Sequence, residues 1–268
     1  MVVPKPLKVQ ITMQDKLDRI KDDTPTLFLN PLAIMQSIYD FHIDKFRSMF
    51  ATNLPGFWNS VSDTDPRWTA MGWIKDMSLW QQRAIPIVIH GDGATFTEKN
   101  SNSLLAVQIK SLCSSGTFGL DILPLFAIPK TVRHIHEGVD ATTPKLWQYM
   151  VHFINAGQEG KHPMTDPDGN EWPLATAEKQ RAGHGFCDEH FLVPWVLTGD
   201  LEFLGNELKM PHFNSNEPCW QCAANRYRDT ATPVTDFHPQ ASWTDTLFFQ
   251  AAIAIQGLLT TRCSISEA

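Results

Sequence analysis

Residues 86–112 read PIVIHGDGATFTEKNSNSLLAVQIKSL, and this stretch decides the fold class. Residues 85–89 are apolar and β-branched, which is typical of a short buried strand. Residues 104–112 and 120–128 predict two further strands. Asp92 follows the first strand between two glycines, which let a ligand or phosphate approach the backbone closely. The sequence therefore predicts an α/β domain with a carboxylate beside its first strand.

Two other segments carry clear signals for the start of a helix. Asn30 and Pro31 suit the N-cap and the first position of a helix, and Thr143 and Pro144 repeat this pattern. The second of these helices is expected to stop at Gly157. The remaining expected elements are an extended lead-in over residues 1–30 with a short helix around 14–21, a helix over 65–82, an inserted hairpin within 162–173, and a helix over 243–259.

A second carboxylate follows another predicted strand. Residues 186–197 predict this strand, and Pro194 within it indicates an edge position or a bulge. Asp200 comes soon after, where the strand fixes the carboxylate and the loop leaves it reachable. Cys219 and Cys222 then form a Cys-x-x-Cys pair in a polar, Asn-rich loop, which is typical of a metal knuckle.

This order of features resembles DDE/D-type DNA transposases of the En/Spm (CACTA), Plavaka and KDZ-like kinds. In them an Asp is followed by a short helix, a Lys-Met pair, a Phe-Asn step and a Cys-x-x-Cys. The matching residues here are Asp200, Lys209, Met210, Phe213, Asn214, Cys219 and Cys222. The resemblance covers residues 85–228. It implies an RNase H-like mixed sheet with flanking helices, in which the first Asp ends the first strand and the next two strands return as a meander.

The resemblance also implies a function, a partner and a location. It implies DNA strand cleavage and transfer in the nucleus, with Asp92 and Asp200 as ligands of Mg²⁺ or Mn²⁺, ions that suit oxygen ligands. One ion of a pair would activate water or a 3′-hydroxyl, and the other would stabilise the leaving oxygen. A third acidic residue is needed, for which Asp245 is the candidate. The structural alternative is a β-turn at residues 91–93 and a helix cap at Asp200.

A structural zinc ion is the second predicted metal. Cys219 and Cys222 need two more ligands for a closed tetrahedral site. Cys187 and His190 form a Cys-x-x-His pair on the other side of Asp200, so these four residues would clasp the loop around that carboxylate. The alternative is a set of ordinary reduced cysteines, with Cys187 buried in a strand.

Composition limits the range of functions. The net charge of −7 counts against strong non-specific DNA binding, which requires clustered Lys and Arg. Five cysteines, an odd number, and an N-terminus without an apolar signal segment favour an intracellular, reducing compartment. The longest late apolar run, residues 247–259, is too short to span a bilayer, so no membrane partner is expected. The sequence does not set the oligomeric state.

Two alternatives to an active transposase stay open. The transposase core itself is expected to be a truncated, decayed or domesticated copy. One alternative is a non-catalytic, zinc-stabilised interaction module that keeps the transposase fold without its chemistry. The acidic charge favours this alternative. The other is an unrelated metallohydrolase built on scattered histidines, for which His134 and His136 beside Glu137 are the candidates. The transposase resemblance implies a mainly helical N-terminal region over residues 1–84 and an RNase H-like core over residues 85–268, with a zinc-knuckle-like loop and a C-terminal helix.

Overall fold

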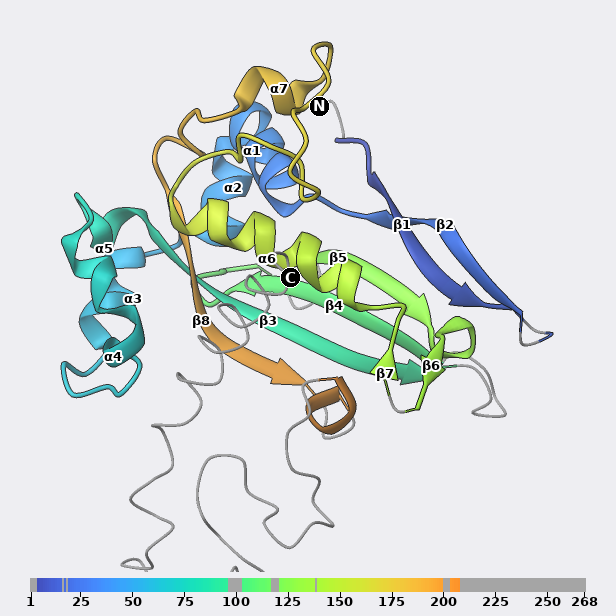
Figure 1. Ribbon diagram of the computed structural model, residues 1–268. Helices are drawn as coiled ribbons and strands as arrows, with labels where there is room; N and C mark the ends of the chain where they lie inside the picture. Colours follow the sequence, from blue (N-terminus) through green and yellow to red (C-terminus); the bar gives the residue numbers. More distant parts are fainter. Residues whose placement is uncertain are drawn as a thin grey trace, which may run out of the picture. The chain divides into compact units, whose positions relative to one another are not determined.

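The computed structural model describes residues 4–15, 17, 19–95, 103–116, 121–137, 139–199 and 203–207 (Figure 1). The chain divides into two compact units, residues 1–58 with 81–197 and residues 59–80 with 198–268. The strands are β1 (Leu7–Gln14), β2 (Ile20–Phe28), β3 (Ala84–Thr95), β4 (Ser103–Ser111), β5 (Ile122–Pro129), β6 (Ile135–His136), β7 (Val139–Asp140) and β8 (Phe191–Gly199). The α-helices are α1 (Pro31–Phe41), α2 (Ile43–Phe50), α3 (Leu54–Ser60), α4 (Trp68–Met71), α5 (Trp80–Arg83), α6 (Pro144–Gln158) and α7 (Ala177–Arg181). Short 3₁₀ turns cover Gly72–Asp76 and Lys130–Val132, and a turn of π-helix covers Phe203–Glu207.

A mixed four-stranded sheet forms the centre of the first unit. Its strands lie in the order β5-β4-β3-β8, and β3, β4 and β5 form an antiparallel meander. The sequence predicted these four strands, and the α/β class is confirmed. In the described part of the sheet β8 is an edge strand, which explains how it accommodates Pro194, a residue without a backbone donor.

The first predicted strand is longer than the sequence indicated. β3 continues through both glycines to Thr95, because Gly91 pairs with Val107 and Gly93 pairs with Leu105 in β4. The structural alternative, a β-turn at residues 91–93, is therefore wrong. Asp92 lies inside the strand rather than after it. The alternation of side chains along β3 therefore decides which face of the sheet Asp92 occupies.

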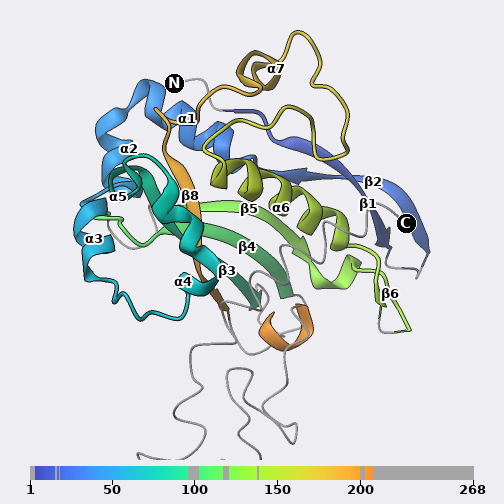
Figure 2. The ribbon, with the colours of Figure 1, turned by 60° about the vertical axis from the view of Figure 1, so that its left-hand side comes forward.

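Helix α6 covers one face of this sheet (Figures 1 and 2). On that face Val107 of β4 pairs with Phe126 of β5, and the Phe126 ring packs edge-on against Trp147 of α6 at 5.6 Å between centroids. Because side chains alternate along a strand, Leu105 and Ile109 share this face, and both are buried. The opposite face therefore carries the intervening residues of β3 and β4.

The N-terminal segment is a hairpin, so the short helix predicted at residues 14–21 is wrong. β1 and β2 pair in antiparallel fashion, and the Asp15 carboxylate accepts hydrogen bonds from the backbone N–H groups of Leu17 and Arg19 in the connecting turn. Val9 and Ile11 are buried at alternate positions, as a half-buried strand requires. The hairpin thus belongs to the core of the first unit.

The predicted helix starts are correct, but two other helix predictions need correction. The Asn30 side chain accepts hydrogen bonds from the N–H groups of Leu32 and Ala33 and caps α1. α6 ends at Gln158, one residue after the predicted stop at Gly157. Gly157 instead allows close packing, because a Cβ there would come within 2.7 Å of the Leu192 side chain. The predicted helix over residues 65–82 is broken into short turns. None of the helices in the described ranges is long and apolar enough to cross a membrane.

Candidate active site

The best-placed candidate is Asp92, on the sheet face opposite α6. Asp92 pairs with Ala106 of β4. His90 lies two positions before Asp92 in β3, so the two side chains share this face of the sheet. Gln108 pairs with His90 directly across the strands. Asp92 is half-buried, and its carboxylate makes no hydrogen bond or ion pair with any residue that the structure describes. This carboxylate is therefore available to a ligand in the described part of the chain.

The other predicted acidic residues lie outside the described residues. β8 ends at Gly199, and Asp200 is the next residue along the chain. Asp245 belongs to residues 208–268, which also hold the predicted helix at 243–259. A shared metal site of Asp92, Asp200 and Asp245 therefore stays a prediction. The position of β8 beside β3 is the part of that prediction that the structure supports.

The described half of the predicted zinc site is a buried, tightly bonded turn. Cys187 is fully buried, and burial raises the pKa of its free thiol well above the usual range. Nδ1 of His190 lies 2.5 Å from the Cys187 carbonyl oxygen, which leaves Nε2 as the nitrogen available to a ligand. Cys219 and Cys222 lie outside the described residues, so the four-residue zinc site stays a prediction.

The histidines proposed for a metallohydrolase lie on a small exposed hairpin. The His134 and His136 rings stack at 6.2 Å between centroids, and the His136 side chain is 75% exposed beside Glu137. Within the described ranges, no three His, Cys, Asp or Glu side chains are grouped to hold a metal ion. The described residues thus give this alternative no third ligand.

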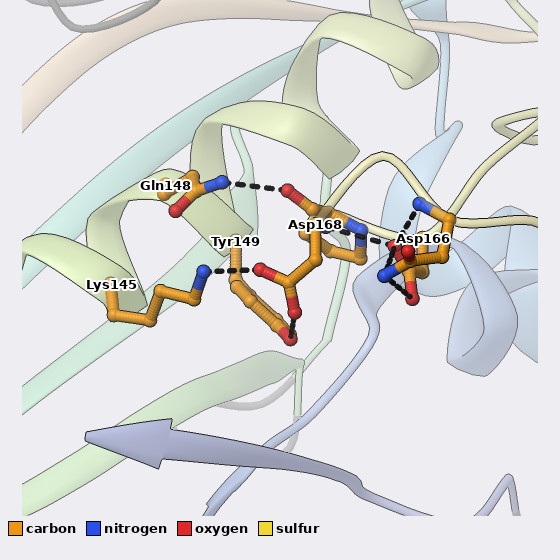
Figure 3. A network of polar contacts seen from close by, with 7 residues as sticks. Lys145, Gln148, Tyr149, Asp166 and Asp168 are labelled. Atoms are coloured by element: carbon orange, nitrogen blue, oxygen red, sulfur yellow. Dashed lines mark hydrogen bonds and ion pairs between the residues drawn. The ribbon is translucent and has the colours of Figure 1, made fainter. Parts of the chain in front are cut away.

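The acidic side chains of the loop at residues 162–173 attach this loop to α6 and stabilise its own turn (Figure 3). Asp168 accepts a hydrogen bond from the Tyr149 hydroxyl at 2.8 Å and pairs with Lys145, both on α6. Burial would raise the pKa of Asp168, but these two partners outweigh it and lower the pKa. The Asp166 carboxylate accepts the N–H groups of Asp168 and Asn170 within the loop. As predicted, the loop is a hairpin turn, in which Thr165 bridges Glu171.

The buried His162 makes the stability of the fold depend on pH. Nε2 of His162 donates to the Gln36 side-chain oxygen at 3.1 Å, and burial together with the Arg181 charge lowers the His162 pKa to about 4. The unfolded chain then binds the proton more readily than the folded one. This contribution to stability is present above pH 6.5 and is lost as the pH falls toward 4.

We expect acidification from pH 7 to pH 5 to cost about 2 kcal/mol through His162 alone. Urea unfolding at the two pH values measures this loss, and His162→Gln should reduce it. His136→Gln, on an exposed residue, is the matched control and should leave the pH dependence unchanged. An identical pH dependence in wild-type protein and His162→Gln would contradict the assignment.

No protein family, curated protein or solved structure matches the chain. The candidate site therefore rests on its own geometry. His90 is the site residue that the sequence analysis missed. Its place two positions before Asp92 in an apolar strand was a usable signal, because alternate strand residues share a face.

Proposed function

We propose that residues 85–268 are the RNase H-like core of a DDE/D-type transposase, which cleaves and transfers DNA strands with Mg²⁺ or Mn²⁺. The observation that carries this proposal is the position of Asp92 in a central strand next to β8, the strand that leads to Asp200. The antiparallel meander of β3, β4 and β5 before α6 supports it, since the resemblance implies this order.

Asp92 fits the metal that this proposal requires. A carboxylate supplies the oxygen ligand that Mg²⁺ and Mn²⁺ prefer, and the Asp92 carboxylate has no competing cation in the described part of the chain. When bound, a metal pair supplies an activated water or 3′-hydroxyl and stabilises the leaving oxygen. In the proposed site Asp92 and Asp200 hold this pair, and Asp245 is the proposed third carboxylate.

A non-catalytic, zinc-stabilised interaction module is the second candidate. The net charge of −7 favours it, because an acidic chain repels the phosphate backbone unless basic residues cluster locally. In this candidate Cys187, His190, Cys219 and Cys222 hold a structural zinc ion, and the carboxylates do no chemistry. Its partner surface is not DNA.

One set of measurements on the full chain separates the two candidates. For the transposase core we expect nicking of supercoiled DNA that depends on added Mn²⁺ and stops with a chelator, together with Mn²⁺ binding by calorimetry. For the interaction module we expect neither, but one bound zinc ion per chain that is lost in Cys219→Ser. Absence of nicking and of Mn²⁺ binding would contradict the first candidate, and absence of zinc would contradict the second.

A further inference from the structure

A pocket of about 340 Å³ lies in the first unit, between α1, α2, the start of α3 and the turn before β8. Its size is at the lower end of the range for small-molecule sites. Ile43 and Leu54 contribute to its apolar wall, and Tyr39, Asp188 and His190 bring polar groups to it. The combination of an apolar wall with a few polar groups is typical of a binding site.

The turn that supplies two of these polar residues has an unusual backbone. Cys187, Asp188 and Glu189 have φ values of 44°, 58° and 61°, and none of them is glycine. Sparsely populated conformations of this kind cluster at ligand sites. The Gln36 side chain accepts the Cys187 N–H at 2.8 Å, and Arg83 pairs with Glu189 at 2.5 Å. These contacts hold Asp188 at the pocket wall.

The polar groups of the pocket are suited to bind a ligand that donates hydrogen bonds. Neither the Asp188 carboxylate nor the Tyr39 hydroxyl makes a hydrogen bond to a described residue. His190 uses Nδ1 toward the Cys187 carbonyl oxygen, so Nε2 of the neutral ring is an acceptor. The pocket thus offers three acceptors, one of which carries a full negative charge.

Arg47 also lines the pocket, and its positive charge acts on Tyr39 and His190, but its side chain is largely exposed to solvent. Its guanidinium lies 3.7 Å from the Asp44 carboxylate, and its side chain is 69% exposed. We propose that the pocket binds a protonated alkyl amine, with the ammonium group on Asp188 and Tyr39 and the alkyl stem against Ile43 and Leu54. This chemistry occurs in the lysine side chain of a peptide and in a free polyamine.

Calorimetric titration of the full chain tests this proposal with three probes. They are 1,5-diaminopentane, the blocked peptide acetyl-Gly-Lys-Gly-amide, and hexanoate, which keeps an alkyl stem but carries the opposite charge. We expect binding of at least one amine and about a tenfold or greater loss of affinity in Asp188→Asn. The matched control is Asp23→Asn. Like Asp188, Asp23 is a solvent-exposed aspartate with a positive φ, which is 54°.

Asparagine tolerates the left-handed backbone, so Asp188→Asn removes charge without adding strain. If it nevertheless fails to fold, Tyr39→Phe keeps the ring and removes the hydroxyl alone, and it should also weaken amine binding. Tighter binding of the peptide identifies a lysine side chain as the ligand, and tighter binding of the diamine identifies a polyamine. Equal affinity in wild-type protein and Asp188→Asn, no amine binding, or preferred hexanoate binding would overturn the proposal.

Discussion

Replacing Asp92 with asparagine is expected to lower Mn²⁺-dependent DNA nicking by about 100-fold or more. Loss even of groups that only orient a metal ligand costs about 10–100-fold in metal affinity or activity, and loss of a ligand itself should cost at least as much. Asparagine has the size of aspartate, so the pairing of Asp92 with Ala106 in β4 should persist. We also expect the dissociation constant of Mn²⁺ to rise at least about tenfold, which calorimetry measures independently of activity.

A charge-matched variant separates this effect from a change in net charge. Asp76→Asn removes one negative charge from an exposed position and should retain nicking and Mn²⁺ binding. Equal loss in both variants would show that overall charge, rather than a metal site, governs activity. Unchanged nicking and unchanged Mn²⁺ affinity in Asp92→Asn would remove Asp92 from the proposed site.

Replacing Phe28 with alanine is expected to lower the free energy of unfolding by about 3–5 kcal/mol. Phe28 is fully buried at the end of β2, and its ring centroid lies 5.7 Å from Tyr149 and 5.8 Å from Phe153, both on α6. It also stacks on Phe126 of β5 at 6.2 Å. Truncation would leave a cavity between the hairpin, the helix and the sheet. Urea unfolding of the full chain measures this cost.

The control for this substitution is Phe41→Ala. Phe41 ends α1 and is 53% exposed, so its truncation should cost less than about 1 kcal/mol. A similarly small loss in Phe28→Ala would mean that the N-terminal hairpin contributes little to the core. The structural assignment of β1 and β2 to the first unit would then be wrong.

The sequence was most informative where local patterns suffice. The run around Ile87 and Ile89 predicted a buried strand, and Asn30 predicted the start of α1, because both signals involve neighbouring residues. The β1–β2 hairpin was missed because the charged residues 14–21 also fit a short helix. The hairpin is favoured instead by the pairing of β1 with β2 and by the packing of Phe28 against Phe126 and Tyr149, which lie far along the chain.

The candidate sites were predictable to different degrees. Asp92 could be identified from its strand, but its position inside β3 depends on the register with β4, which no local pattern encodes. The turn at residues 187–189 could not be predicted, because non-glycine residues adopt positive φ there through contacts with Gln36 and Arg83. The sequence motif at Cys187 and His190 predicts metal binding, which stays a prediction. The structure adds that His190 and Asp188 line a pocket.

Gln36 has a further consequence for the order in which the protein folds during synthesis. Its side-chain oxygen accepts from the Cys187 N–H and from His162, which lie 151 and 126 positions further along the chain. Contacts between residues so far apart in sequence form only after the chain has lost the conformational entropy of closing a long loop. Helix α1 can form early, as it leaves the ribosome, but the pocket can close only after residue 190 has been added. A nascent chain therefore carries this binding site unfinished until late in translation.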